Sequence, residues 1–244
     1  MIIKSMHRIV FLFLVLLASA CSSAIANTAI EPKPKGNWIL RHLQMVDRAR
    51  QGDIDVVLLG DSITDYWPKR APEVYEHTFG AYKTANFGIS ADRTQHLLWR
   101  LQNGIGEGYS PKVTVLLIGT NNTGMEKDGT TPRNSTAETI EGILQVIEEI
   151  RTRFPDTTLL LFALFPRGTA DNFQRDQIRE INSALSRLHN GKSIRYIDIG
   201  DQFLDPDGEI PESLMPDKLH PAPDGYKIWA AALEEPLSQL LKQD

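Results

Sequence analysis

Ser62 is the residue of this 244-residue chain whose position most suggests a nucleophile. It follows the apolar run 56–59 after Gly60 and Asp61, where a buried strand would turn into a helix. In parallel sheets this end of a strand holds the ligand, and the amides that open the helix point to the same place. A turn with an ordinary helix cap has the same composition, so Ser62 needs support from elsewhere in the chain.

His220 is the candidate base. A serine hydroxyl is a weak nucleophile and needs a base within hydrogen-bond reach, which a third group must orient. In Asp217-Lys218-Leu219-His220-Pro221 the carboxylate precedes the imidazole by three residues, so it can reach Nδ1 and leave Nε2 free. The alternative is a turn capped by Asp217 with an exposed histidine. Of the other histidines of the domain, His42, His77 and His189 are expected to be solvated, and His96 is expected to be structural.

Acyl transfer also needs hydrogen-bond donors where the carbonyl oxygen becomes an anion. The backbone N–H groups of Ser62 and Gly88 and the side-chain amide of Asn121 are candidates for this oxyanion hole. Gly88 has no Cβ, which would let a substrate approach its backbone. Asparagine is also favoured in turns, which is the alternative explanation for Asn121.

The elements that must position these groups alternate along the chain. This alternation predicts an α/β fold, a doubly wound parallel sheet of about five strands with helices on both faces. Residues that follow different strands then meet at one edge of the sheet, as Ser62, Gly88 and Asn121 would. The expected strands are 56–59, 84–87, 113–118, 159–164 and 194–197, and the expected helices are 38–50, 63–67, 73–79, 94–101, 135–154, 174–188 and 224–241.

The first residues read as an export signal. Residues 1–20 combine a basic start with an apolar run that is shorter than the ~20 residues of a membrane span. The following Cys21, the only cysteine, resembles the lipidated first residue of a mature bacterial lipoprotein, although Ala18 stands where such signals usually have Leu. Cleavage after Ala26 is the alternative and would release a soluble protein. We expect residues 21–36 to be a linker, with an extended spacer at 29–36, and residues 37–244 to form one domain.

Charge restricts the partners. Without residues 1–20 the chain has 24 basic and 31 acidic residues, a net charge of −7. This balance disfavours nucleic acid, because phosphate binding requires a basic patch. If Cys21 is lipidated, the membrane is contacted through the lipid anchor only. The sequence indicates no oligomeric state.

Four short blocks resemble the SGNH (GDSL) hydrolase family, and they occur in the family's order across essentially the whole mature domain. Further blocks resemble the catalytic subunits of the platelet-activating-factor acetylhydrolase type. The four blocks are Gly60-Asp61-Ser62, Asn86-Phe87-Gly88, Gly119-Thr120-Asn121-Asn122 and Asp217-x-x-His220, and the further blocks are Asn86-Phe87-Gly88-Ile89, His96-Leu97-Leu98-Trp99-Arg100-Leu101 and Leu164-Phe165-Pro166-Arg167-Gly168.

This resemblance implies a flavodoxin-like sheet, the SGNH hydrolase fold, with Ser62 as nucleophile, His220 as base and Asp217 as its partner. It implies oxyanion donors at Ser62, Gly88 and Asn121 and no metal or organic cofactor. One departure is that Ser90 and Ala91 replace glycines that often follow Ile89 in the subgroup. Their side chains are expected to narrow the mouth of the site.

The expected function is that of an exported serine esterase which removes a small acyl group, with acetyl favoured, from an ester. An O-acetylated carbohydrate is favoured as substrate, because an envelope protein meets polysaccharide. A lipid esterase acting on lysophospholipid or short-acyl phospholipid is the alternative within the enzymes. A non-catalytic carbohydrate-binding protein on an esterase scaffold is the alternative of another class, but it would be expected to lack one of Ser62, Asp217 or His220. Asp61 is assigned to holding the turn before Ser62.

Overall fold

The computed structural model describes residues 26–241. The predicted signal peptide 1–20 and Cys21 lie outside these residues. Within them, no helix is both long and apolar enough to cross a membrane.

Five strands form one all-parallel sheet in the order β2-β1-β3-β4-β5, the flavodoxin-like order. β1 pairs with β3 along its full length, from Val56 opposite Val113 to Gly60 opposite Leu117. Both strands are buried at every position, as expected for the centre of a parallel sheet. The predicted sheet is therefore confirmed, with strands β1 (Val56–Gly60), β2 (Thr84–Asn86), β3 (Val113–Leu117), β4 (Thr158–Phe162) and β5 (Ile194–Ile197).

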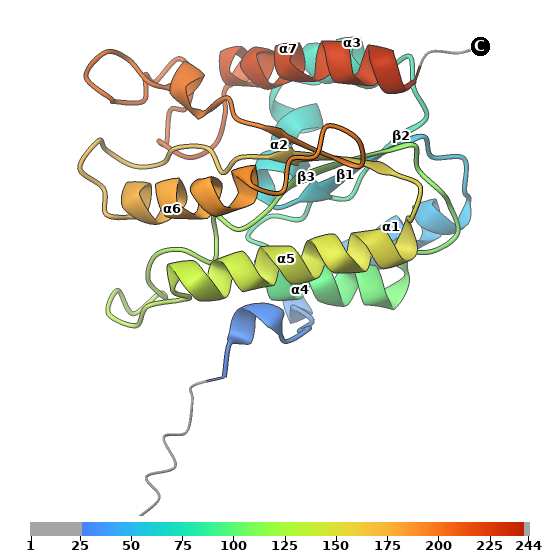
Figure 1. The fold of residues 1–244 in the computed structure, drawn as a ribbon, viewed down its shortest axis with the longest axis horizontal. Coiled ribbons are helices and arrows are strands. Elements are labelled where there is room, and N and C mark those ends of the chain that lie inside the picture. Colours follow the sequence, from blue (N-terminus) through green and yellow to red (C-terminus); the bar gives the residue numbers. More distant parts are fainter. Residues whose placement is uncertain (1–25, 242–244) are drawn as a thin grey trace, which may run out of the picture.

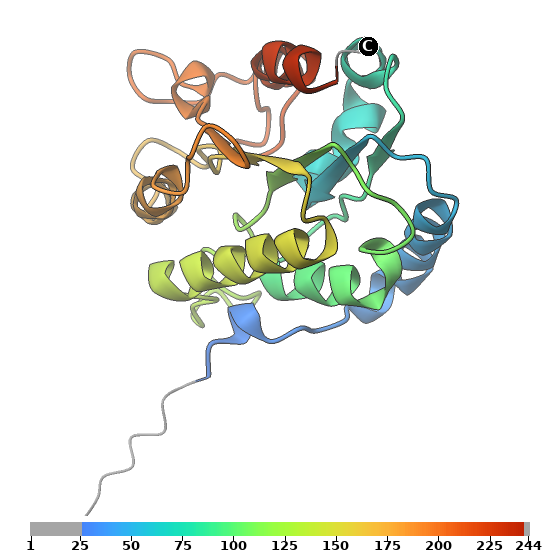
Figure 2. The same cartoon turned by 45° about the vertical axis from the view of Figure 1, so that its right-hand side comes forward.

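Helices cover both faces of the sheet (Figure 1). On one face α2 (Ser62–Arg70) packs with α3 (Pro72–Phe79), and α3 packs with α7 (Pro223–Leu240). On the other face α5 packs between α4 and α6. Figure 2 shows the same layers after a turn of 45°. The helices of this second face are α1 (Ile39–Arg50), α4 (Thr94–Arg100), α5 (Thr136–Arg153) and α6 (Gln174–Ser186).

Local sequence explains where α5 begins and ends. The Ser135 Oγ accepts the Glu138 N–H at 3.2 Å, and the Glu138 carboxylate accepts the Ser135 N–H at 2.8 Å. This is the reciprocal capping box that the sequence predicts. The helix ends at Arg153, before Pro155.

Part of the predicted spacer at 29–36 contacts the domain, although residues 30–34 and 36 are exposed. Ala29 is fully buried, and its carbonyl accepts the Thr94 Oγ1 hydrogen at 2.8 Å. The Lys33 N–H donates to the Gln95 carbonyl at 3.1 Å. In Figures 1 and 2 this blue segment runs beneath α4 and α5. Proline content suggested an extended linker but could not show that small side chains would fit against these helices.

His42 also differs from the expectation that it is solvated. Its ring packs against those of Trp38 and Trp99, with centroids 5.8 and 5.0 Å away, and only 2% of the residue is exposed. His42 Nε2 lies 3.0 Å from the Asn103 carbonyl. His77 and His189 are exposed, as expected.

Candidate active site

Ser62 is the first residue of α2, directly after β1. Asp61 forms the N-cap, because its Oδ1 accepts the Ile63 N–H at 3.0 Å, which confirms its assignment to the turn. A Cβ on Gly60 would lie 2.2 Å from Thr64 Oγ1 and 2.5 Å from the Leu117 carbonyl oxygen, so only glycine fits there. The turn thereby holds the Ser62 side chain at the carboxyl edge of the sheet.

Ser62, His220 and Asp217 form one hydrogen-bonded chain. Ser62 Oγ lies 2.9 Å from His220 Nε2, and His220 Nδ1 lies 2.6 Å from Asp217 Oδ2. When Nδ1 carries the proton and donates it to the carboxylate, Nε2 is free to accept the serine hydrogen. The structure therefore brings together the three residues that were predicted to act together.

The turn that carries His220 is fixed from within and from outside. Asp217 Oδ1 accepts the N–H groups of Leu219 at 3.1 Å and His220 at 2.7 Å. Lys218 adopts a left-handed conformation with φ +55°, and its carbonyl accepts the Gly168 N–H at 2.8 Å. The Gly168 contact explains how the segment after β4 supports the site, which is a role that sequence reasoning did not assign.

The candidate oxyanion donors are partly engaged. The Gly88 N–H donates to Asn86 Oδ1 at 2.9 Å, and Asn121 Nδ2 donates one hydrogen to the Asp92 carbonyl at 3.0 Å. The amide of Asn121 has a second hydrogen that this contact leaves free. A Cβ on Gly88 would lie 2.5 Å from the Asp65 backbone nitrogen, so packing against α2 already requires glycine here, whatever the substrate needs.

A buried ion pair, missed in the sequence, links the segments that carry these donors. Arg100 and Asp92 are both fully buried and lie 2.7 Å apart. Arg100 also donates to the Phe87 carbonyl at 2.7 Å and, through Nη2, to the Gly60 carbonyl at 3.4 Å. It therefore ties the end of β1, the residue before Gly88 and the Asp92 backbone that holds Asn121. The signal for it was a charged residue within the apolar helical stretch 97–101.

Two further arginines hold the Asn121 loop. Arg167 Nη1 donates to the Thr120 carbonyl at 3.0 Å, and Arg133 Nη1 donates to the Asn121 carbonyl at 3.1 Å. The Arg167 charge also acts on Asp61 and Asp217. These contacts hold the two peptide groups on either side of the Asn121 Cα.

Burial and hydrogen bonds shift the pKa values of Asp217 and Asp61 in opposite directions. Burial raises the pKa of Asp217, but the hydrogen bonds from His220 and Leu219 outweigh it, so the pKa lies below its ordinary value and favours the carboxylate. Asp61 is fully buried, and burial raises its pKa to about 7 despite the hydrogen bond from Ile63.

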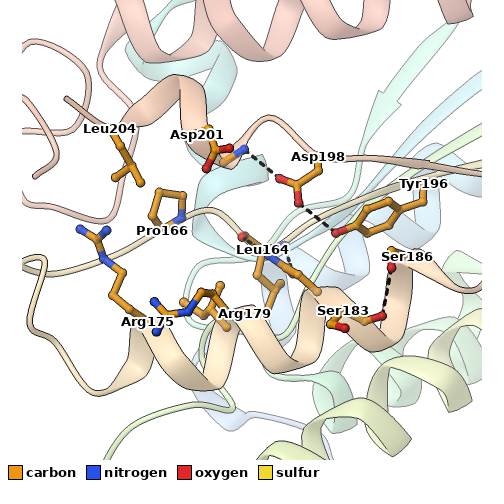
Figure 3. Close-up of a pocket in the computed structure, with 13 residues that line it drawn as sticks. Leu164, Pro166, Arg175, Arg179, Ser183, Ser186, Tyr196, Asp198, Asp201 and Leu204 are labelled. Atoms are coloured by element: carbon orange, nitrogen blue, oxygen red, sulfur yellow. Dashed lines mark hydrogen bonds between the residues drawn. The ribbon is translucent and has the colours of Figure 1, made fainter. Parts of the chain in front are cut away.

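A cavity of about 420 Å³ lies along α6 and the segments after β4 and β5, and not at Ser62, His220 and Asp217 (Figure 3). Tyr196 donates to Asp198 Oδ2 at 3.2 Å in its wall, and none of the predicted site residues lines it. Among residues 26–241, no group of three or more His, Cys, Asp or Glu side chains is arranged to hold a metal ion.

Residues 58–228 match the GDSL-like lipase/acylhydrolase family. The chain belongs to this family. Human platelet-activating factor acetylhydrolase IB subunit alpha1 is 32% identical over 226 residues, which cover 89% of this chain and 93% of the human protein. As a GDSL acylhydrolase, the protein is a carboxylic ester hydrolase. The family resemblance drawn from the sequence blocks is confirmed.

Solved structures of two esterases share the fold. An acetyl xylan esterase superposes with a TM-score of 0.62 at 20% identity and covers 75% of this chain and 100% of its own. A carbohydrate acetylesterase from Sinorhizobium meliloti superposes with a TM-score of 0.57 at 15% identity and covers 77% of this chain and 99% of its own. At these identities the likeness concerns the fold.

Proposed function

We propose that this acylhydrolase removes a small acyl group, with acetyl favoured, from an ester through an acyl-Ser62 intermediate. The observation that carries the proposal is the chain of contacts from Ser62 Oγ to His220 Nε2 at 2.9 Å and from His220 Nδ1 to Asp217 Oδ2 at 2.6 Å. A nucleophile, a base and a group that orients the base are thus in hydrogen-bond reach.

In the first half of the reaction, Ser62 Oγ attacks the carbonyl carbon while His220 Nε2 takes the hydroxyl proton. The bond to the alcohol oxygen then breaks, and His220 returns the proton to that oxygen. In the second half, His220 takes a proton from water, whose oxygen attacks the acyl carbon. The bond between the acyl carbon and Ser62 Oγ then breaks, His220 returns the proton to Ser62 Oγ, and the acid is released. Asp217 remains a carboxylate throughout and stabilises the imidazolium.

The oxyanion would be stabilised by the Ser62 N–H and by the second hydrogen of the Asn121 side-chain amide. The Gly88 N–H would join them only by sharing its hydrogen with Asn86 Oδ1, to which it now donates at 2.9 Å. Ser62 and Asn121 therefore carry most of this proposed role.

For the substrate, we favour an O-acetylated carbohydrate. The platelet-activating factor acetylhydrolases and the acetyl xylan esterase are named for the removal of acetyl groups, which supports acetyl as the acyl half. Proposed export to the cell envelope, where polysaccharide is abundant, supports the carbohydrate half. A lipid acetyl ester is the second candidate, because the relatives at 31–32% identity are platelet-activating factor acetylhydrolases.

Ser62→Ala should lower p-nitrophenyl acetate hydrolysis by roughly 10⁶-fold, because the nucleophile is lost. The measurement is kcat of the purified variant beside the wild type and Ser110→Ala, which changes an exposed serine outside the site. Unchanged hydrolysis by Ser62→Ala would show that another residue is the nucleophile.

An acyl series from acetate to octanoate, acetylated xylan and a short-acyl phospholipid, tested on the wild type, then separates the two substrate candidates.

We also propose that the chain is exported and anchored through Cys21, with cleavage after Ala26 as the alternative. The composition of residues 1–20 supports export, and the position of the only cysteine supports lipidation. Cys21→Ser should move the protein from the membrane to the soluble fraction, measured by fractionation of expressing cells. If the variant stays in the membrane fraction to the same extent as the wild type, the lipid anchor is wrong.

A further inference from the structure

A hydrogen bond connects α2, which begins at Ser62, to the loop after β2 that contains Gly88. Tyr66 lies on α2, one turn after Ser62, and Ser90 lies in the loop after β2, two residues after Gly88. The Tyr66 hydroxyl and Ser90 Oγ are 2.9 Å apart. Both side chains are half-buried, so this Tyr66–Ser90 bridge borders solvent at the site.

Two further contacts, with His220 and Arg70, hold the Tyr66 ring in place. Its centroid lies 5.2 Å from that of the His220 ring, at an angle of 45°. The Arg70 guanidinium carbon lies 4.9 Å from the centre of the Tyr66 ring. The ring therefore stands directly beside the candidate base and cannot turn away without losing both contacts.

The backbone of Ser90 is held by Lys35, which precedes α1. Lys35 Nζ donates to the carbonyls of Ser90 at 3.2 Å and Ala91 at 3.0 Å. Ala91 has φ +61°, a left-handed conformation that is unfavourable for a residue with a Cβ. The loop thus keeps a strained shape that the Lys35 ammonium stabilises, and this shape presents the Ser90 hydroxyl to Tyr66.

The chemistry decides which half of the substrate meets this bridge. The imidazole that accepts the Ser62 proton must return it to the leaving alcohol oxygen. That oxygen must therefore lie within hydrogen-bond reach of His220 Nε2. The Tyr66 ring, whose centroid lies 5.2 Å from that of the His220 ring, is therefore placed to contact the alcohol half of the ester.

We infer that the Tyr66–Ser90 bridge is a wall of the alcohol-half pocket and determines which alcohols the enzyme releases. This inference rests on the proposed function and adds the residues that select the leaving group. Branching at the carbon next to the ester oxygen brings bulk against the bridge, whereas an unbranched alcohol can pass it. Smaller side chains at either position should therefore admit branched alcohols more readily.

The test compares kcat/KM for n-propyl acetate and isopropyl acetate, which share the acyl half and have isomeric alcohols. Ser90→Gly and Tyr66→Ala should each raise the ratio of isopropyl to n-propyl acetate by roughly tenfold, the effect of relieving a contact with one methyl-sized group. Tyr66→Phe, which keeps the ring and loses the bond to Ser90, should raise the ratio less. The ratio of n-propyl butyrate to n-propyl acetate should stay constant, because the acyl half does not meet the bridge.

Ser110→Gly is the matched control, since it changes an exposed loop serine outside the site. Thermal unfolding of each variant shows whether it is folded. If Tyr66→Ala does not fold, the Ser90→Gly variant still decides the test. If the alcohol ratio of Ser90→Gly equals that of the wild type, or if the acyl ratio changes instead, the inference is wrong. A wild type that hydrolyses neither acetate, or an unchanged rate in Ser62→Ala, would instead refute the proposed function.

Discussion

Asp61 carries a buried carboxyl directly before the candidate nucleophile. One oxygen accepts the Ile63 N–H, but Oδ2 is buried without a hydrogen-bond partner among the described residues. Such a group resists ionisation, which explains why burial raises its pKa to about 7. The turn gains an N-cap from Asp61 and would be destabilised by its charge at higher pH.

Asp61→Asn should therefore change how stability depends on pH. The unfolded chain releases the Asp61 proton near the ordinary aspartate pKa of 3.8, and the folded chain releases it near 7. Between these values the folded state holds more protons, so the free energy of unfolding of the wild type falls as pH rises through this window. The amide keeps the acceptor for Ile63 and has no charge, so the variant should lack this loss, which is on the order of 4 kcal/mol.

Urea unfolding of both proteins at pH 4 and pH 8 measures the effect. Other titrating groups are common to the two proteins and cancel in the comparison. An equal fall in the free energy of unfolding between pH 4 and pH 8 in both proteins would mean that Asp61 is ionised at little cost.

At the scale of elements, Arg100 connects parts of the site that are distant in sequence. It pairs with Asp92 and donates to carbonyls at the ends of β1 and β2. Removing one partner of a buried pair leaves the other charge uncompensated, which typically costs about 3–5 kcal/mol. The catalytic geometry should suffer together with stability, because the Asp92 carbonyl accepts the Asn121 amide at 3.0 Å.

Arg100→Met should thus lower the free energy of unfolding by about 3–5 kcal/mol, measured by chemical denaturation. Arg179→Met is the control, since Arg179 forms an exposed ion pair on a helix whose loss should cost about 1 kcal/mol or less. Asp92→Asn combined with Arg100→Met should cost less than the two single changes added together. A cost for Arg100→Met as small as that for Arg179→Met would show that the pair is not a structural link.

Sequence patterns predict the elements that have local causes. Apolar runs reveal β1 and β3, and the capping box at Ser135 reveals the start of α5, because each depends on neighbours along the chain. The placement of Ser62, Gly88 and Asn121 after β1, β2 and β3 also follows from the α/β alternation. The Arg100–Asp92 pair could not be predicted, since nothing local indicates which acid a buried arginine will meet.

At the scale of the whole molecule, the segment 26–36 contacts the rest of the domain. Asn134 Nδ2 donates to Thr28 Oγ1 at 3.1 Å, and Thr94 Oγ1 donates to the Ala29 carbonyl at 2.8 Å. A Cβ on Gly142 of α5 would lie 2.9 Å from Ala29 Cβ, so the segment fits closely against that helix. The sequence shows prolines and polar residues here, and a close fit between two surfaces leaves no pattern in either one.

Removal of residues 1–35 should therefore destabilise the domain relative to removal of residues 1–25. The longer deletion loses the burial of Ala29 and several hydrogen bonds worth ~1 kcal/mol each, so a loss of ~2 kcal/mol should lower Tm by roughly 4–8 °C. It also removes Lys35, so the ratio of isopropyl to n-propyl acetate should rise as the Ser90 loop loosens. Lys35→Met in the full chain separates the two effects, because it should raise the ratio while leaving the packing of Ala29 intact. Equal Tm values for the two deletions would mean that the segment only rests on the surface, and an unchanged ratio in Lys35→Met would mean that Ala91 holds its left-handed conformation without help.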